Sequence, residues 1–303
     1  MTACTEPVVA AKSGAAAVEA AVFVRHDLAD AAVRAASHAR LYLGSETCES
    51  LVPAARTVRQ LQQLVRARRI ALTLVTPPCT DRGLLRVERM LGVTAPGTEV
   101  VCNDWGVLER LHDSPFKPVL GRLLLRIPRG FSRLALDHMS REMRAFVRHS
   151  SLDSAEFRAF LAEQRVTRVE LDNVAQGYSF RAGPTLRTSL YHPYVYIASG
   201  RRCLHERLRG RDDAYRTGRA CGKTCHDVVV VGKIGPAGER VLVSECAHFY
   251  ENALVRAALP ARARPWGVDR LVDCSALAAG RAALPTKFLH REDRGISWSE
   301  NFT

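Results

Sequence analysis

Residues 70–91 read IALTLVTPPCTDRGLLRVERML and contain one complete strand-and-helix unit. Five of the first six residues are apolar, and three of the six are β-branched, which favours a buried strand. Asp81 can then begin a helix whose apolar side chains include Val87 and Leu91. A buried strand followed by an amphipathic helix is the repeating unit of parallel α/β sheets.

Similar units recur on both sides of this stretch, about 25 to 30 residues apart, as βαβ connections require. The pattern predicts further strands at residues 21–24, 40–43, 98–102, 118–120, 166–171, 194–198 and 268–272. An antiparallel hairpin is expected from residues 227–231 and 240–244. Such repeats point to a doubly wound sheet or a (β/α) barrel, and of the two we expect an α/β protein with a barrel-like fold of the TIM type, complete or incomplete. Residues 20–303 would form one domain after a flexible, alanine-rich tail at residues 1–19.

Composition narrows the class of protein and its partners. The 303 residues are 47% hydrophobic, enough for a large core, and no apolar run approaches the ~18 residues that a membrane span needs. The N-terminus lacks the basic and apolar regions of a secretory signal, so we expect a cytoplasmic protein. The net charge of +13, almost all from arginine, favours anionic partners such as RNA, a multi-carboxylate metabolite or an acidic protein.

Three cysteines form a C-x17-C-x3-C pattern, Cys203, Cys221 and Cys225. A fourth, Cys48, follows the strand predicted at residues 40–43. Because the loops after barrel strands share one face, Cys48 and Cys203 map to the same place. From the residues alone, an iron–sulfur cluster, a zinc ion and no metal remain open.

The nine cysteines are odd in number and irregularly spaced, which argues against a disulfide framework. Five of them have no close thiol neighbour in sequence, and we expect these to be small buried apolar residues: Cys4, Cys79, Cys102, Cys246 and Cys274.

Polar residues at predicted strand ends are candidates for chemistry. Glu170 and Asp172 would point into the barrel mouth as catalytic carboxylates, with Asn173 beside them binding substrate, or they would make structural hydrogen bonds. Asn103 and Asp104 end another strand and would bind substrate, although Asp104 could equally cap the next helix.

His192, Tyr194 and Tyr196 alternate along one predicted strand and would share a face. His192 and Tyr196 are then candidate proton donors and Tyr194 a substrate contact, with core packing as the alternative for the tyrosines. Arg201 and Arg202 flank Cys203, where they could bind carboxylates or offset the charge of a thiolate cluster.

Four motifs resemble the collagenase-like U32 peptidase family, in particular its short members that assist oxygen-independent ubiquinone hydroxylation. The motifs are LYLGS at 41–45 with Cys48 beyond it, EVVCNDWGVL at 99–108, VEL at 169–171 and SGRRC at 199–203. The resemblance covers residues 22–231. Many family members carry another cysteine seven residues before the cysteine of the SGRRC motif. In this sequence that position is Tyr196, and Cys48 would replace the missing ligand.

The resemblance implies a barrel-like fold with a 4Fe–4S cluster at the C-terminal ends of the strands. Its ligands would be Cys48, Cys203, Cys221 and Cys225, carried by loops around residues 44–50 and 199–226. The resemblance further implies an enzyme, or a hydroxylase subunit, acting on a small aromatic or quinone-like metabolite, with prephenate as oxygen donor.

Three alternatives remain beside this one. Hydroxylation of a transfer or ribosomal RNA base would suit the net charge. A non-catalytic partner subunit would form a heterodimer with a paralogue and use the cluster structurally. Proteolysis comes last, because the sequence contains no Gly-x-Ser-x-Gly and no His-Glu-x-x-His.

Overall fold

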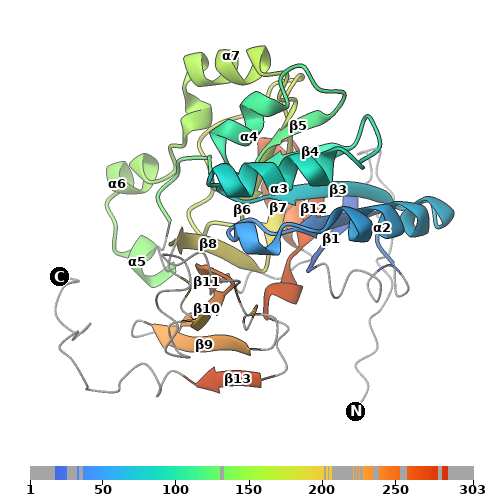
Figure 1. Ribbon diagram of the computed structural model, residues 1–303. Coiled ribbons are helices and arrows are strands. Elements are labelled where there is room, and N and C mark those ends of the chain that lie inside the picture. Colours follow the sequence, from blue (N-terminus) through green and yellow to red (C-terminus); the bar gives the residue numbers. More distant parts are fainter. Residues whose placement is uncertain are drawn as a thin grey trace.

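The computed structural model contains a closed β-barrel and a second, five-stranded sheet (Figure 1). It describes residues 18–25, 33, 37–129, 133–200, 203, 205–206, 221, 223, 225, 228–234, 239–252, 258–278 and 282–285. The tail expected at residues 1–19 lies outside this part up to residue 17, whereas Glu19 already belongs to the first strand.

Eight parallel strands form the barrel, in the order β1-β12-β7-β6-β5-β4-β3-β2. They are β1 (Glu19–Val24), β2 (Arg40–Gly44), β3 (Ala71–Thr76), β4 (Glu99–Cys102), β5 (Lys117–Leu120), β6 (Arg168–Asp172), β7 (Arg187–His192) and β12 (Val268–Asp273). The ring is complete because β1 pairs with β2 on one side and with β12 on the other. The expectation of a TIM-like α/β barrel is confirmed, and the barrel is closed.

Helices follow several barrel strands and cover the outside of the barrel (Figure 1). They are α2 (Ala55–Ala67), α3 (Asp81–Leu91), α4 (Trp105–Arg110), α5 (Arg133–Asp137), α6 (Arg141–Phe146), α7 (Ala155–Glu163) and α9 (Leu259–Ala263). Short 3-10 turns are η1 (Glu49–Leu51), η2 (Ser151–Asp153), η5 (Arg264–Trp266) and η6 (Ser275–Ala278). The sequence-predicted helix at Asp81 is confirmed; the Thr80 hydroxyl caps it by accepting from the N–H of Gly83.

Charged side chains fill the N-terminal end of the barrel. Glu99 opens β4, and Arg270 of β12 donates to its carboxylate at 2.7 and 3.2 Å. Arg270 also donates to Glu19 at 2.6 Å and to the Tyr42 hydroxyl at 2.8 Å. Because these groups come from four of the barrel strands, the network links distant parts of the ring and satisfies charges that would otherwise be costly to bury.

The second sheet has the order β13-β9-β10-β11-β8. Its strands are β8 (Tyr194–Ser199), β9 (Val228–Ile234), β10 (Glu239–Ser244), β11 (Ala247–Glu251) and β13 (Ala282–Pro285). It packs against the barrel interior, since Phe23 and Tyr191 of the barrel share one hydrophobic cluster with Leu242 and Phe249 of the sheet. Four of the five strands are inserted between β7 and β12, and the sheet lies to one side of the barrel in Figure 1.

One sequence-predicted strand belongs to a different sheet from the one expected. Residues 194–198 form part of β8, which pairs with β11 in the second sheet rather than with a barrel strand. The barrel position is taken by β7, whose sequence, RTSLYH, is too polar to have been recognised. The predicted hairpin is confirmed, because β9 and β10 pair antiparallel with Val231 opposite Leu242.

No helix in the described ranges is long and apolar enough to cross a lipid bilayer.

Candidate metal centre

The turn between β10 and β11 gathers several cysteine-bearing segments. Ser244 pairs with Ala247, so Glu245 and Cys246 form a two-residue turn, and Glu245 takes a left-handed conformation with φ 56°. The carbonyl of Cys246 accepts a hydrogen bond of 3.0 Å from the N–H of Gly200. This bond places Gly200, directly after β8 and three residues before Cys203 in sequence, beside the turn.

The loop after β2 is attached to the same turn. The hydroxyls of Ser45 and Thr47 both donate to Oε2 of Glu245, at 2.5 and 2.9 Å. The Ser45 hydroxyl also accepts from the N–H groups of Thr47 and Cys48. The backbone around Cys48 is therefore fixed relative to Cys246 by side chains that are themselves buried.

Arg25, at the end of β1, brings in the third segment. Its guanidinium is 2% exposed and donates to the carbonyl of Cys225 at 2.6 Å and to the Ser244 hydroxyl at 2.8 Å. A further bond of 3.2 Å goes to the carbonyl of Leu277. One buried arginine thus connects the barrel, the second sheet and the Cys225 segment.

The thiols that these segments carry interact with one another. The Cys246 thiol interacts with the thiols of both Cys203 and Cys48. The interaction between Cys203 and Cys246 lowers the pKa of Cys203 and raises that of Cys246. Burial raises the pKa of Cys221 and of Cys225, and the nearby Cys48 and Cys203 add to both shifts. Five cysteines therefore form one neighbourhood.

The four cysteines predicted as ligands, Cys48, Cys203, Cys221 and Cys225, are all in this neighbourhood. Metal binding stays a prediction: among the residues that the structure describes, no three or more His, Cys, Asp and Glu side chains are arranged to hold a metal ion. The donor set nonetheless fits an iron–sulfur cluster, which takes thiolates as ligands.

Cys246 is the site residue that the sequence reasoning missed, since it was expected to be a small apolar core residue. Its position depends on the second sheet, whose β11 strand was not predicted. The cysteine lies in the turn between β10 and β11. The turn could have been recognised only if β11 had also been predicted.

A buried ion cluster lies next to the thiols. Arg122, which follows β5, donates to Glu46 at 2.6 and 2.9 Å and to Oδ1 of Asp172 at 2.8 Å. The other oxygen of Asp172 accepts from Arg129 at 2.8 Å, and the N–H of Tyr196 donates to Oδ1 at 3.0 Å. Asp172 was predicted as a catalytic carboxylate; the structure shows it held by two arginines that the sequence analysis did not single out.

Glu170 lies deeper in the barrel than the mouth position expected of it. It is fully buried, and its Oε1 accepts from the Tyr42 hydroxyl at 3.0 Å. Its Oε2 has no hydrogen-bond partner within the described ranges. Burial raises the pKa of Glu170 to about 7, against the opposing influence of Arg270 and Arg168.

His192, Tyr194 and Tyr196 do not alternate along one strand, so that part of the prediction is wrong. His192 ends β7, and the chain turns through Pro193 into β8, which carries both tyrosines. Tyr194 is buried, whereas the partly buried Tyr196 lies with its ring centroid 5.3 Å from the Arg129 guanidinium. Catalytic or binding roles for these residues stay predictions.

The remaining candidates are engaged in local structure or lie outside the described part. Asp104 caps α4 by accepting from the N–H groups of Gly106 and Val107. The Asn103 side chain donates to the carbonyl of Thr76 at 3.0 Å. Asn173 is 1% exposed, and neither of its amide atoms is hydrogen-bonded to a described residue. Arg201 and Arg202 are outside the described residues.

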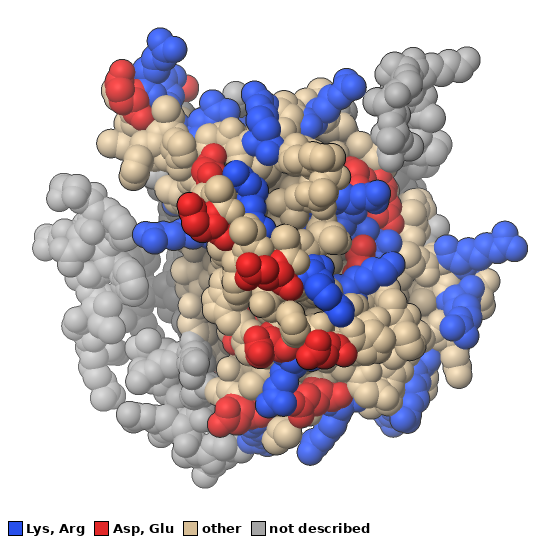
Figure 2. Space-filling model, turned by 90° about the horizontal axis from the view of Figure 1, so that it is seen from above, with Lys and Arg blue, Asp and Glu red and all other residues tan. Residues whose placement is uncertain are grey.

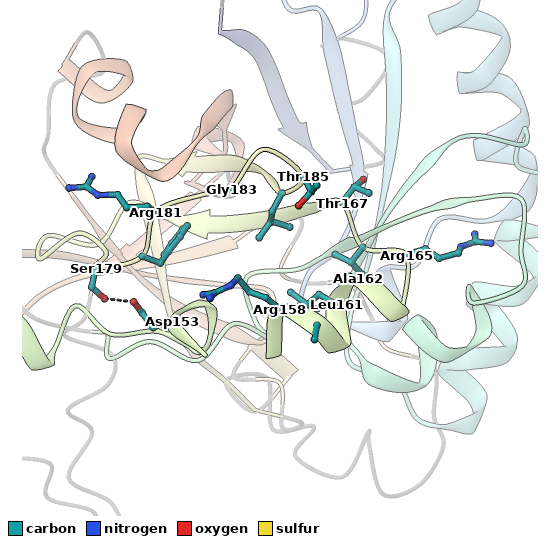
Figure 3. Close-up of a pocket in the computed structure, with 14 residues that line it drawn as sticks. Asp153, Arg158, Leu161, Ala162, Arg165, Thr167, Ser179, Arg181, Gly183 and Thr185 are labelled. Carbon is teal, nitrogen blue, oxygen red and sulfur yellow. Dashed lines mark hydrogen bonds between the residues drawn. The ribbon is translucent and has the colours of Figure 1, made fainter. Parts of the chain in front are cut away.

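A separate cavity of about 770 Å³ opens at the other end of the barrel (Figure 3). It lies between α7 and the segment leading into β7, and Thr167, just before β6, lines it. Figure 3 shows Arg158 directed toward its middle, with Arg165 and Arg181 directed away. None of the sequence-predicted site residues lines this cavity.

Comparisons with known proteins found a structural similarity and no match by sequence. No protein-family model matches it, and no curated protein matches it. A solved structure described as the U32 peptidase Mk0906 is similar over 90% of this chain and 98% of its own, at 12% identity and a TM-score of 0.39. Fold and site together define an α/β barrel protein with a partly buried group of cysteines.

Proposed function

We propose that this protein binds a 4Fe–4S cluster at its cysteine centre and works in an oxygen-independent hydroxylation system. The observation that supports the proposal best is that Cys48, Cys203, Cys221 and Cys225, with Cys246, lie close enough to influence one another's thiol pKa although they come from chain segments far apart in sequence. An isolated thiol usually packs as a small apolar residue, so a group of five thiols is better explained by a shared ligand.

A bound 4Fe–4S cluster supplies electron transfer. The protein's own residues would hold and shield it. Arg25 carries a positive charge beside Cys225, which suits a thiolate-rich centre. The second sheet carries the turn with Cys246 and would support the centre from one side.

A small aromatic or quinone-like substrate is the version of this proposal that we favour, with prephenate as a candidate oxygen donor. Tyr196 and Arg129 form a cation–π pair near the ion cluster, and Tyr196 is only partly buried. An aromatic ring and a guanidinium side by side can bind an aromatic carboxylate. We infer an enzyme or a hydroxylase subunit on this basis.

RNA hydroxylation is the weaker version. On the face shown in Figure 2, positive and negative side chains are intermixed and no continuous basic surface is visible. A net charge of +13 still leaves nucleic acid binding as an alternative. RNA binding at micromolar or better affinity that weakens steeply with salt would favour it.

A non-catalytic partner subunit has one specific observation in its favour. Trp105 and Phe160 are 46% and 38% exposed, and with Phe157 they form a group of rings whose centroids lie 5.8 to 6.4 Å apart. Exposed aromatic groups often mark protein interfaces. Stable co-purification with a paralogue, and activity that survives loss of the cysteines, would support this function.

The first test is iron and acid-labile sulfide content, with EPR before and after dithionite, on protein purified without oxygen. We expect about four irons per chain, in keeping with a cubane cluster, and loss of most of this iron in Cys48→Ala and Cys221→Ala. Cys102→Ala is the matched control, because Cys102 lies buried in the barrel core. Protein that stays free of iron after anaerobic reconstitution would overturn the proposal, and stoichiometric zinc in its place would remove the redox role.

A further inference from the structure

We propose that Glu245 is a positioning residue of the cysteine centre: its carboxylate holds the Cys48 loop against the turn that carries Cys246. The inference rests on the proposed function in one respect, namely that these thiols act together.

The geometry gives Glu245 contacts to both sides of the centre. It lies one residue before Cys246, and its Oε2 accepts the hydroxyls of Ser45 and Thr47 from the loop that leads to Cys48. Since the Ser45 hydroxyl also accepts from the Cys48 N–H at 3.0 Å, a chain of two hydrogen bonds joins the carboxylate to the backbone of Cys48.

Glu245 is an unfavourable choice for a turn that only reverses the chain. A left-handed φ of 56° suits glycine or asparagine better than glutamate, and its side chain is 2% exposed. Burying a carboxylate is costly unless hydrogen bonds offset the lost solvation. The glutamate at this position is therefore explained by the hydrogen bonds that its carboxylate accepts from Ser45 and Thr47.

The second carboxylate oxygen points to the same conclusion. Oε1 is buried and has no hydrogen-bond partner within the described part of the chain. Glu245 is also close enough to Cys225 to contribute to the raised pKa of that thiol. The carboxylate thus contacts the Cys48 loop and lies near Cys225.

The variants for the test are Glu245→Ala, Glu245→Gln and the double variant Ser45→Ala/Thr47→Val. Glutamine keeps an oxygen that can accept both hydroxyls, so it should rescue what alanine loses. The double variant removes the two donors from the opposite side of the contact and leaves the turn untouched.

The first readout needs no metal: the rate at which iodoacetamide alkylates Cys48 in cluster-free, reduced protein, mapped by mass spectrometry. We expect Glu245→Ala and the double variant to raise this rate about tenfold, as for a loop that opens locally. Cys102 in the barrel core should stay protected in every variant, and Glu245→Gln should remain within about twofold of the wild type.

The second readout is iron bound after anaerobic reconstitution, which should fall by more than half in Glu245→Ala and recover in Glu245→Gln. Unchanged alkylation of Cys48 in both Glu245→Ala and the double variant would overturn the proposal. If Cys102 is alkylated in Glu245→Ala, that variant has unfolded. The alkylation rate of Cys48 in the double variant then tests the proposal. A wild-type protein that binds no iron would contradict the proposed cluster. The alkylation rates would still test the positioning role of Glu245.

Discussion

Arg122 and Asp172 form an ion pair from which water is fully excluded: the two atoms Nη1 and Oδ1 lie 2.8 Å apart, and neither side chain has any exposed surface. Arg122 also packs on the ring of Tyr191, with its guanidinium 4.2 Å from the ring centroid. Because Arg122 binds Glu46 as well, the pair joins the ends of β5 and β6 to the loop that leads to Cys48.

Replacing Arg122 by methionine should lower the free energy of unfolding by about 3 kcal/mol or more. The substitution leaves the carboxylates of Glu46 and Asp172 buried without their main partner. A buried charge without a partner is strongly destabilising. Urea unfolding measures the change. Arg110→Met is the control: its partner Glu88 is 3.5 Å away and both are exposed, so the loss should stay below about 1 kcal/mol.

Stability should fall as the pH rises through the range in which Glu170 titrates. The pKa of Glu170 is raised from 4.5 to about 7 in the folded protein, so between these values the folded state binds more protons than the unfolded state. Rising pH then favours unfolding, by an amount on the order of 3 kcal/mol over the whole range. Urea midpoints measured from about pH 5 to about pH 8 should show this fall as the difference between wild type and Glu170→Gln, because other shifted groups such as His205 contribute equally to both proteins. Equal slopes in both proteins would contradict the assignment.

Gly44→Ala should be far more damaging than Gly97→Ala. Both glycines have positive φ, 140° and 78°, so both substitutions introduce backbone strain. A Cβ at Gly44 would lie 2.1 Å from the carbonyl oxygen of Val75 on the neighbouring strand, whereas a Cβ at Gly97 meets nothing within 4 Å. We expect a loss of about 1 kcal/mol at Gly97 and of more than about 3 kcal/mol at Gly44. Thermal unfolding of the two variants, measured side by side, isolates the clash; similar losses would show that β2 and β3 can separate.

Asp104 separates a structural role from a binding role. Asp104→Ala removes the cap of α4 and the acceptor for the Cys79 N–H, and should cost about 1 to 2 kcal/mol. Asp104→Asn keeps an oxygen acceptor and should retain most of the stability. If the residue only caps the helix, Asp104→Asn will also retain activity once an assay exists. An active alanine variant paired with an inactive asparagine variant would contradict both roles.

The repeating strands could be predicted because their apolar runs are buried on both sides. Residues 70–91 fold as the sequence indicated, into β3 and α3. β7 could not be recognised, because Thr188 and Ser189 are buried polar residues whose partners come from other segments: Thr188 donates to the carbonyl of Trp266. Sequence periodicity contains no information about such distant partners.

The sequence indicated most of the cysteines that the structure brings together, but not the residues around them. The resemblance indicated Cys48 and Cys203 from motifs around each of them, whereas Cys246 becomes a neighbour only through the pairing of β11 with β8. The ion cluster was missed because Arg122 and Arg129 do not stand out among the many arginines of the sequence. The tyrosines of β8 were placed wrongly because alternation predicts a strand but not the sheet that it joins.

The insertion of the second sheet before the final barrel strand sets the order in which the molecule can be completed during synthesis. Glu19 of β1 meets Arg270 of β12 across 251 positions of the chain, so a growing polypeptide cannot close its barrel until β12 has left the ribosome. The turn with Glu245 and Cys246 emerges almost as late. Under the proposed function, a cluster could therefore be loaded only after β10 and β11 have emerged and the turn between them has formed.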